Sequence, residues 1–598
     1  MNYKLIGEVQ AGLTPLEQIL IHRGIPREQI KAYTNANMSN VNPPEAFGEE
    51  RLQECAKTLI TSIKKNDKAI IIIDPDVDGN TASALLLNYL NDLFPAWVQN
   101  NIDFYFHSGK QHGLNDCVDY IIKNKYDLVL CPDAGSNDAA ECEKLMQVDT
   151  SVLILDHHDK DQDNPYAIII NNQNRYSNYP NKALSGVGVV WQFCRYLDKL
   201  MQTDYAMNYL DLVAIGLVGD MMDLRSIETK ALVKEGLKSL HNPFIYFMAQ
   251  KNAFKLGEKI TPIGAAFYIV PLLNAIQRSG TQEEKALIFD SMLGYKAFNQ
   301  ILSTKRGHLL GETEQLVEQA VRVAANVKNR QTRVQDAAVE TLENKIQEEH
   351  LLDHKVLLIL LDGTIDIPAE VRGLIANKFM AKYQRPCCLL SKAEEYSGQT
   401  IDGYRIENSY AGSARGCSLA GVDDFKQVCL DTQNVEYAVG HPNAFGLKLY
   451  ERDLQSFIEK TDKALENMSD QAFYYVDYIF NNKDISAKAI LDIADMSDYW
   501  GSEIDEALIA VKDIKITADM VEIYRKNTNT IKITVPNGVN LMKFDASEEL
   551  CDKLTTGNTG FIQMDIVGKC NKNEWMGNVT AQIFIEDYNI IDSSKYYF

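Results

Sequence analysis

The sequence of 598 residues lacks long hydrophobic runs, paired cysteine motifs and low-complexity tracts. No apolar stretch reaches the ~18 residues that suggest a membrane span, and the first residues do not follow the signal-peptide pattern. We therefore expect a cytoplasmic protein without a membrane segment. The eleven cysteines include no CxxC pair and no repeating spacing. This usage predicts reduced, mostly buried thiols and no zinc cluster.

Positive charge is also scarce, because 60 Lys and Arg stand against 82 Asp and Glu, which gives a formal net charge of -22. This balance argues against a protein that coats nucleic acid nonspecifically. It does not exclude a nuclease, since cations bound in an acidic cleft invert the local potential. The length predicts about three or four domains.

The pattern of apolar residues divides the chain into segments. Strand-like and helix-like runs alternate from 68 to about 225 and again after Val356, which predicts two α/β domains, the first with a largely parallel sheet. An uninterrupted charged stretch from Thr313 to Glu349 predicts a long exposed helix between them. Closely spaced alternating runs after about residue 505 predict a small barrel. The expected segments are N-terminal helical (1–66), first α/β (67–300), connecting helix (301–352), smaller second α/β (353–468) and β-barrel (469–598).

Carboxylates and histidines follow four apolar runs of the first α/β segment. Three alternating aspartates come after the isoleucine-rich run 69–73, and an Asp-His-His triplet follows the run 151–155. Two further apolar runs, which we also interpret as strands, end in a single aspartate. Because ligands bind beyond the carboxyl ends of parallel strands, these side chains are expected to meet at one edge of the sheet. They are Asp74, Asp76, Asp78, Asp133, Asp156, His157, His158 and Asp220.

Each of these aspartates has an ordinary alternative as a helix cap or turn residue. Three alternating aspartates with Gly79 also suggest an EF-hand, but the preceding apolar strand and the missing downstream glutamate argue against one. Helix capping alone does not readily explain why four strand ends of one segment all carry a carboxylate or a histidine pair. Carboxylate oxygen suits hard divalent cations, and imidazole favours Mn, Fe or Zn. The combination predicts a metal centre.

In order and context, these residues resemble the four motifs of the DHH phosphoesterases. The chain as a whole resembles the RecJ single-strand exonuclease branch. Segments 21–25 and 271–278 are similar to its N-terminal helix and its Pro-Arg-Leu-Asn-Ala-x-x-Arg segment. Segments 412–416 and 440–446 resemble the Ser-Gly-Arg-Ser loop and the Gly-His-Ala-Met-Ala-Ala-Gly turn of its second domain, and 573–587 resembles the end of its OB-type domain. The ordered set is specific, whereas no single member would suffice.

The resemblance implies a centre of two divalent cations, Mn2+ or Mg2+, that share Asp133 as a bridging carboxylate. Asp76 would hold one ion, with Asp74 as a ligand or a supporting group. The residues implied at the other ion are Asp78, His157 and Asp220. Paired cations suit in-line phosphodiester hydrolysis, because they stabilise both the attacking and the leaving oxygen.

Other residues implied by the resemblance act on the substrate. His158 would reach the scissile phosphate, and Asp156 would orient His157 by accepting its second ring proton. Arg415 stands in a small-residue loop that suits a bidentate phosphate clamp, with a plain surface turn as the alternative. An ordinary solvated arginine is the alternative for Arg278. The implied substrate-binding residues are Arg278, Asn274, Ser413, Arg415, Gly440 and His441.

The implied function is a metal-dependent exonuclease that degrades single-stranded DNA, in the 5′ to 3′ direction, in a cleft between the two α/β domains. A monomer that serves DNA repair or recombination, with single-strand-binding or replication proteins as partners, fits this reading. One alternative is a DHH phosphodiesterase for short oligonucleotides or cyclic dinucleotides. Another is a catalytically silent DNA-binding scaffold, although such relatives tend to lose metal carboxylates that this chain keeps.

One departure from the family concerns the end of the DNA strand. Segment 105–114 lacks the arginine with which the family commonly holds a terminal 5′ phosphate. Only His107 or Lys110 stands there as a substitute. The resemblance therefore supports hydrolysis more firmly than polarity.

Overall fold

The computed structural model divides into two compact units. The N-proximal unit comprises residues 20–328 and 495–506, and the C-proximal unit comprises residues 1–19, 329–494 and 507–598. The boundaries of the segments expected from the sequence stay a prediction. The structure describes residues 1–107, 111–159, 163–173, 177–361, 363, 365, 367–393, 400–401, 404–405, 408–468, 473–555 and 561–594.

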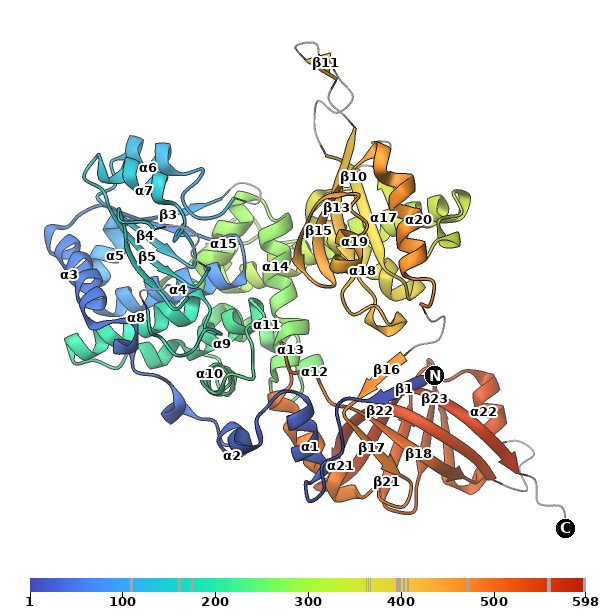
Figure 1. The fold of residues 1–598 in the computed structure, drawn as a ribbon. Helices are drawn as coiled ribbons and strands as arrows, with labels where there is room; N and C mark the ends of the chain where they lie inside the picture. Colours follow the sequence, from blue (N-terminus) through green and yellow to red (C-terminus); the bar gives the residue numbers. More distant parts are fainter. Residues whose placement is uncertain are drawn as a thin grey trace. The chain divides into compact units, whose positions relative to one another are not determined.

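A five-stranded parallel sheet forms the centre of the N-proximal unit (Figure 1). All residues of two neighbouring strands are buried, since helices cover both faces, and this explains why their sequences are apolar without alternation. The predicted parallel-sheet α/β domain is confirmed. In spatial order the strands are β3 (Ile102–Phe106), β2 (Ala69–Ile73), β4 (Leu128–Pro132), β5 (Ser151–Asp156) and β6 (Ile168–Asn171).

Helices α4 (Val77–Leu93) and α8 (Gly186–Met201) contact one face of this sheet. On the other face, α6 (Val118–Asn124) and α7 (Ala139–Met146) pack in a cluster of buried apolar residues with β2, β4, β5 and β6. The other helices of this unit are α2 (Ile30–Thr34), α3 (Glu49–Lys65), α5 (Pro95–Asn101), α9 (Leu210–Gly219), α10 (Ile227–Gly236), α11 (Pro243–Lys251), α12 (Ala253–Leu256), α13 (Pro262–Tyr268), α14 (Val270–Ser279), α15 (Gln282–Met292) and α16 (Gly294–Ala297).

The run that ends at Asp220 is a helix, α9, and the strand predicted there is wrong. Its residues from Leu210 to Val218 are buried on every side. A short, uniformly apolar run has no periodicity that separates a buried helix from a buried strand. Asp220 therefore reaches the carboxyl edge of the sheet from a helix C-terminus.

A buried lysine joins residues 495–506 to the rest of the N-proximal unit. The Lys230 Nζ atom lies 3.4 Å from the ring centroid of Tyr33 and 3.2 Å from that of Tyr499, and it donates a hydrogen bond to the Tyr33 carbonyl (2.7 Å). Burial lowers the pKa of Lys230 to about 6, while the two ring faces favour its charged form. The lysine thus connects α2, α10 and the segment around Tyr499.

The long helix α17 (Leu316–Glu348) follows a short hairpin of β7 (Gln300–Leu302) and β8 (Thr313–Gln315). The charged pattern predicted a helix from Thr313, but this residue pairs in the hairpin, and the Leu316 N–H bonds the Asn299 carbonyl at its base. Ala338, Leu342 and Ile346 are buried in an apolar cluster. The predicted exposed helix is therefore amphipathic and buries one stripe.

The C-proximal unit contains a second α/β domain, as predicted. Helices α17 and α18 (Ala369–Tyr383) pack on one face of its sheet, and α19 (Phe425–Asp431) and α20 (Leu454–Ala464) pack on the other. Strands β9 and β10 are parallel, and the rest pair antiparallel. The strands in spatial order are β14 (Val435–His441), β15 (Ala444–Tyr450), β13 (Ser409–Arg415), β10 (Cys387–Lys392) and β9 (Leu357–Leu361).

The C-terminal region forms a seven-stranded sheet that is open among the described residues, and not the predicted closed barrel. Alternating apolar residues determine which side of a strand is buried, whereas closure depends on strand tilt and register across the sheet. The strands are β17 (Tyr478–Asn481), β18 (Leu508–Ile516), β22 (Phe561–Trp575), β23 (Asn578–Ser594), β21 (Val539–Lys543), β20 (Asn529–Thr534) and β19 (Val521–Arg525).

Two further strand pairs and three helices complete this unit. Strand β1 (Asn2–Leu5) pairs in parallel with β16 (Phe473–Val476), and β11 (Thr400–Ile401) pairs with β12 (Tyr404–Arg405). The helices are α1 (Pro15–His22), which continues into the N-proximal unit, α21 (Ala487–Ala494) and α22 (Glu548–Thr555). Within the described part of the chain, no helix combines the length and the apolar character that crossing a membrane requires.

Candidate metal centre

The three aspartates that follow β2 differ in position and in hydrogen-bond partners. The Asp74 side chain is 1% exposed. Asp76 is the N-cap of α4 and accepts a hydrogen bond from the Gly79 N–H (2.9 Å). Asp78, in the first turn of α4, accepts hydrogen bonds through Oδ1 from the Ser185 hydroxyl (2.9 Å) and the Val187 N–H (3.2 Å). Asp76 is therefore a helix cap, as the ordinary alternative expected, but capping uses only one carboxylate oxygen and leaves the other available to a cation.

Asp133 follows β4 with a φ of 69°, a left-handed conformation that aspartate and asparagine tolerate better than most residues. Its backbone N–H is bonded to the Leu155 carbonyl (2.7 Å) on the neighbouring strand. Gly186 at the start of α8 lies against the carboxylate, because a Cβ atom built on this glycine would be 2.3 Å from Asp133 Oδ1. The missing side chain at Gly186 therefore makes room for Asp133.

The Asp156-His157-His158 triplet starts at the last residue of β5. The Asp156 carboxylate accepts hydrogen bonds from the backbone N–H groups of both histidines (2.7 and 3.1 Å) and of Ser136 (3.1 Å). Its ring partner is His158, whose Nδ1 lies 2.8 Å from Oδ1. The expectation that Asp156 orients the ring of His157 is therefore wrong, because the backbone turn after β5 places the second imidazole of the pair beside this carboxylate.

His157 is 8% exposed, and it faces the other aspartates instead. Its Nε2 atom lies 3.3 Å from Asp133 Oδ1, 3.4 Å from Asp220 Oδ2 and 4.0 Å from Asp78 Oδ2. These atoms belong to the turn after β4, the C-terminus of α9 and the first turn of α4. The sequence could therefore indicate them only through their shared position at the carboxyl edge of the sheet.

The converging side chains form three groups with donor atoms within 4.8 Å of one another. Two of these groups share Asp133. All six residues predicted as metal ligands belong to the groups, and so does His158. The groups are Asp74, Asp76 and Asp133; Asp78, His157 and Asp220; and Asp133, His157 and His158.

The electrostatics of this cluster match a cation site. Burial, followed by repulsion from Asp74 and Asp78, raises the pKa of Asp76 to about 7, and burial with the neighbouring aspartates raises that of Asp220 to about 8. The pKa of Asp133 is raised well above its usual value for the same reasons. Both Asp133 carboxylate oxygens, and one oxygen each of Asp78 and Asp220, have no hydrogen-bond partner among the described residues. Buried, unpaired carboxylates are costly unless they bind a cation, so the residues present fit one.

The His158–Asp156 pair predicts a pH-dependent stability of the metal-free protein. The hydrogen bond to Asp156, opposed by burial, raises the pKa of His158 to about 9 from 6.5. When folding raises the pKa of a histidine, that histidine stabilises the folded protein fully at pH values below 6.5, its pKa in the unfolded chain. The contribution is lost as the pH rises through about 9, its pKa in the folded protein. We expect His158→Gln to lower Tm by on the order of 2 °C below pH 6.5, and the effect is this small because the His158 ring is half exposed. Above pH 9 the ring is neutral, so the substitution should leave Tm unchanged. Thermal unfolding in EDTA across this range measures the difference, and a constant Tm difference would contradict the pairing.

The sequence reasoning missed His112 at this centre. Its Nδ1 atom lies 2.9 and 3.1 Å from the two Asp74 carboxylate oxygens, and this hydrogen bond raises the pKa of His112. Of the two residues expected to replace the family arginine, His107 is buried against Asp116 (2.7 Å), and Lys110 lies outside the described residues. The proximity of His112 to the DxDxDG loop depends on a turn that has no local sequence signal.

Helix α14 carries the predicted substrate residues Asn274 and Arg278, which are four positions apart and share one helix face. Arg278 is exposed, and Asn274 is half-buried. The preceding Gln277 donates a hydrogen bond to the Asn80 side chain (3.0 Å), whose amide in turn bonds the backbone carbonyls of Asp74 and Asp76. Gln277 thereby fixes α14 to the loop that carries the first aspartates.

The other predicted substrate residues lie together in the second α/β domain. Ala444 of β15 pairs with Arg415 on one side and with His441 on the other. Directly paired residues point to the same face, which Ser413, two residues from Arg415, also shares. His441 is exposed, whereas Gly440 has a φ of 131° and lies against Phe445, so a side chain there would be strained.

Asn443, between β14 and β15, holds the segment 422–425 in place, a role that the sequence reasoning did not identify. Its side-chain amide donates to the carbonyls of Val422 (3.3 Å) and Asp423 (2.9 Å), and its carboxamide oxygen accepts from the Phe425 N–H (3.1 Å). Gly416 beside Arg415 leaves room for Asn443, because a Cβ atom there would be 1.9 Å from its oxygen.

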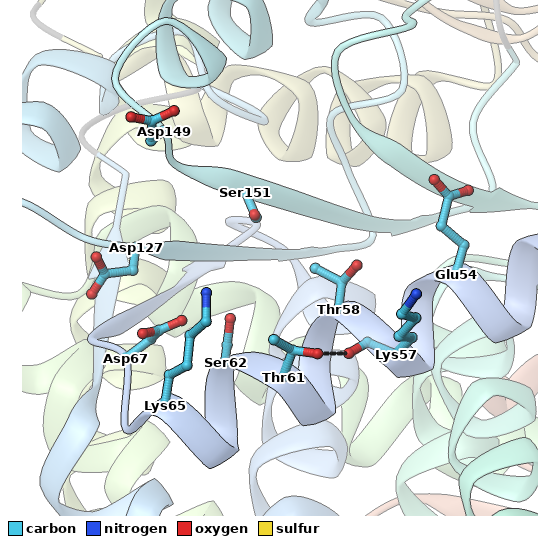
Figure 2. A pocket seen from close by; sticks show the side chains of 10 residues that line it. All are labelled: Glu54, Lys57, Thr58, Thr61, Ser62, Lys65, Asp67, Asp127, Asp149 and Ser151. Carbon is cyan, nitrogen blue, oxygen red and sulfur yellow. Dashed lines mark hydrogen bonds between the residues drawn. The ribbon is translucent and has the colours of Figure 1, made fainter.

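A polar pocket of about 440 Å³ lies at the opposite edge of the parallel sheet (Figure 2). Figure 2 shows side chains of α3 facing residues that precede or begin the strands, such as Asp127 and Ser151. Ligands of open α/β sheets bind at the carboxyl ends of the strands, so this pocket is separate from the metal centre.

Comparisons with known proteins place the fold in a family. Residues 68–217 match the N-terminal domain of the DHH family, and residues 476–587 match the RecJ OB domain. The chain is 31% identical over 597 residues to a prophage SPbeta protein of Bacillus subtilis (strain 168), covering 100% of this chain and 99% of that protein, which carries the provisional name of a single-strand DNA-specific exonuclease. The chain belongs to the RecJ-like branch of the DHH family. It is also 24% identical to the single-stranded-DNA-specific exonuclease RecJ of the same bacterium, over 97% of this chain and 68% of that protein.

Solved RecJ structures share the fold of this RecJ-like chain. RecJ from Thermus thermophilus in complex with Mn2+ matches with a TM-score of 0.66 and 16% identity, covering 99% of this chain and 80% of that one. The same protein in complex with Mg2+ matches with a TM-score of 0.59 and 15% identity, covering 100% and 79%. At this identity the likeness shows the arrangement of the elements.

Proposed function

We propose that this RecJ-like chain is a metal-dependent exonuclease that hydrolyses the phosphodiester bonds of single-stranded DNA from the 5′ end. The observation that carries the proposal is the convergence of six aspartates and histidines, several with unpaired buried oxygens, at the carboxyl edge of one sheet. The exonuclease relatives, and the Mn2+ and Mg2+ in the Thermus thermophilus RecJ structures, support the same reading.

The centre would hold two divalent cations, Mn2+ or Mg2+, and Asp133, which belongs to two of the three donor groups, would be among their ligands. Asp74 and Asp76 would hold one cation, and Asp78, His157 and Asp220 the other, as the two separate groups of donors indicate. Bound there, the cations supply an activated water and neutralise charge on the phosphate. His158 presents its ring beside them, and the Asp156 carboxylate holds that ring through Nδ1 (2.8 Å). Its Nε2 is then available to a phosphate oxygen.

The substrate strand needs contacts beyond the centre, and the paired residues of β13, β14 and β15 offer them. Gly373 of α18 lies against Arg415 and Ser413, since a Cβ atom on this glycine would be 2.5 Å from an Arg415 guanidinium nitrogen. This packing limits the positions of the guanidinium, which donates to its own chain at Ala414 (2.7 Å). A held guanidinium binds phosphate bidentately at a small entropic cost.

Arg415→Gln is expected to raise KM on single-stranded DNA about tenfold, because a charge-assisted contact to phosphate is lost, with little change in kcat or Tm. Steady-state kinetics with Mn2+ measure this effect. Arg452→Gln, an exposed arginine in the same unit, is the matched control and should leave KM unchanged. A KM that does not respond to Arg415→Gln would remove the residue from the substrate path.

Digestion of end-labelled single-stranded DNA and RNA with Mn2+ or Mg2+ tests the proposed function. We expect mononucleotide products from DNA, released first from the 5′ end, and no products in EDTA. Activity confined to dinucleotides or cyclic dinucleotides would instead support the phosphodiesterase alternative, and no hydrolysis of any substrate would support a scaffold. We also propose a monomer that receives its strand from single-strand-binding or replication proteins, since a chain of net charge -22 attracts DNA weakly.

A further inference from the structure

The segment 495–506 belongs to the N-proximal unit, although the chain on both sides of it belongs to the C-proximal unit. It starts with a short 3₁₀ helix (Asp495–Tyr499), and Ala507 alone separates its end from β18. Within it, Gly501 and Ile504 pair through two backbone hydrogen bonds (2.9 and 3.2 Å). The chain thus contributes a tight turn to the unit that contains the metal centre, just before it enters the C-terminal sheet.

The turn that follows Asp220 is strained. Asp220 ends α9, and the next residues form a Schellman motif, in which the Met222 N–H bonds the Leu217 carbonyl (3.0 Å). Met221 has a φ of 55°, at the position of this motif where glycine is usual. A residue with a Cβ atom is disfavoured in this left-handed conformation, so the surrounding structure has to support it.

Ser502 supports this turn at two points. Its hydroxyl donates a hydrogen bond to the Met221 carbonyl, although the two residues are 281 positions apart in the sequence. Its own carbonyl accepts a hydrogen bond from the Leu224 N–H (3.3 Å). A single residue of the segment therefore holds the strained peptide after Asp220 and the end of the same turn.

Other contacts enclose the end of the turn. The Tyr33 hydroxyl of α2 donates a hydrogen bond to the Leu224 carbonyl (3.2 Å). The Leu224 side chain is 3% exposed and lies against Gly501, because a Cβ atom on this glycine would be 2.5 Å from Leu224 Cδ1. Both backbone groups and the side chain of Leu224 are thus held, so the turn does not behave as a free loop.

The segment that carries Ser502 is itself anchored. The Trp500 side chain next to it is 3% exposed. The Tyr499 hydroxyl donates a hydrogen bond to the Thr34 carbonyl (2.7 Å), and the Tyr499 ring centroid lies 3.2 Å from Lys230 Nζ. Because its neighbours are fixed in this way, the Ser502 hydroxyl is a donor at a defined position.

The Asp220 carboxylate depends on its backbone more than Asp78 in the same donor group does. Asp78 Oδ1 accepts two hydrogen bonds, whereas Asp220 Oδ2 has no hydrogen-bond partner among the described residues. Asp220 Oδ2 nevertheless lies 3.4 Å from His157 Nε2. Its place in the donor group is therefore set by the end of α9 and by the turn that Ser502 holds.

We propose that Ser502 is a positioning residue of the metal centre: by holding the strained peptide after Asp220, it keeps this carboxylate beside Asp78 and His157, where the three side chains would hold one cation. The inference rests on the proposed metal centre. It gives the stretch of chain that leads into the C-terminal sheet a role in metal binding.

The ordinary alternative is that Ser502 only stabilises the fold, and Thr150 provides a matched comparison. The Thr150 hydroxyl donates a hydrogen bond to the Tyr126 carbonyl (2.7 Å), and these residues precede β5 and β4, at the edge of the sheet opposite the metal centre. Ser502→Ala and Thr150→Val each remove one hydroxyl–carbonyl hydrogen bond. Both are expected to lower Tm in EDTA by about 2 °C, but only Ser502→Ala should change metal binding.

Isothermal titration of the full-length protein with Mn2+ tests the proposal. We expect the wild type to bind two ions and Ser502→Ala to bind one of them about tenfold more weakly, as the loss of a group that orients a metal ligand does. Thr150→Val, and Ser502→Thr, which keeps the hydroxyl, should bind both ions like the wild type. Equal affinities in the wild type and Ser502→Ala, or an equal loss in Thr150→Val, would overturn the role of Ser502 alone. A wild type that binds no Mn2+ would overturn the metal centre as well.

A second substitution tests whether Ser502 acts through the strained peptide. Glycine adopts a φ of 55° without a Cβ clash, so Met221→Gly should make the turn less dependent on the Ser502 hydroxyl. The double variant Ser502→Ala/Met221→Gly is therefore expected to recover most of the Mn2+ affinity that Ser502→Ala loses. No recovery in the same titration would overturn the proposed route from Ser502 to Asp220.

Discussion

Asp133→Asn is expected to lower Mn2+-dependent hydrolysis of single-stranded DNA by more than about 10³-fold, because the carboxylate shared by two donor groups is removed. Asparagine keeps the left-handed backbone at this position, so the turn after β4 should persist. Nuclease assays with Mn2+ and Mg2+ measure the loss. Retained turnover would place the reaction elsewhere in the molecule.

We expect the same substitution, Asp133→Asn, to stabilise the metal-free protein although it removes activity. Burial and the neighbouring aspartates disfavour a charged Asp133 in the metal-free protein. When folding raises the pKa of a carboxyl group, the protein is destabilised once the pH exceeds the pKa of that group in the unfolded chain. A neutral side chain at this position should therefore raise Tm in EDTA at pH 8 by about 2 °C. The stabilisation that Mn2+ gives to the wild type should disappear in the variant. Asp119→Asn, an exposed aspartate on α6, is the control and should change neither quantity.

Gly186→Ala is expected to reduce activity about 10- to 100-fold, as other changes that displace a metal ligand do. The added Cβ atom would lie 2.3 to 2.6 Å from three atoms of the Asp133 side chain, so the carboxylate has to move away from the shared position. The Mn2+ affinity should fall together with kcat. Isothermal titration with Mn2+ and single-turnover kinetics measure the two effects.

The control for this glycine is another helix N-terminus. Gly294→Ala at the start of α16 would place its Cβ 3.6 Å from the nearest atom, an ordinary contact, and should leave activity unchanged. Normal Mn2+ affinity in Gly186→Ala would show that the carboxylate tolerates a methyl group. Full unfolding of Gly186→Ala would be visible in its circular dichroism and would separate a folding defect from a displaced ligand.

Much of the candidate centre was predictable because its residues cluster in short segments. The apolar run before Asp74 and the run before Asp156 have the length and the branched residues of buried strands. Parallel strands that end at the same edge bring such residues together without detailed knowledge of the packing. Asp220 was predicted at the centre from an apolar run interpreted as a strand and from its place in the motif order; the run is a helix, so only the second ground holds.

The partners of individual side chains were not predictable in the same way. The choice between His157 and His158 as the ring partner of Asp156 depends on one backbone turn, and neither residue type distinguishes them. The contact of His112 with Asp74 joins residues from two separate loops. The role of Gly186 follows from a close approach of α8 to Asp133, and glycine in a sequence does not indicate its neighbours.

The sequence by itself determined the kinds of atoms at this centre and the parallel sheet that delivers them, because residue type and apolar periodicity are local properties of the chain. Tertiary structure alone decided which oxygens stay unpaired, which histidine meets which aspartate, and whether the C-terminal strands close. These outcomes depend on distances between segments far apart in the chain, and packing sets such distances only when all elements are in place.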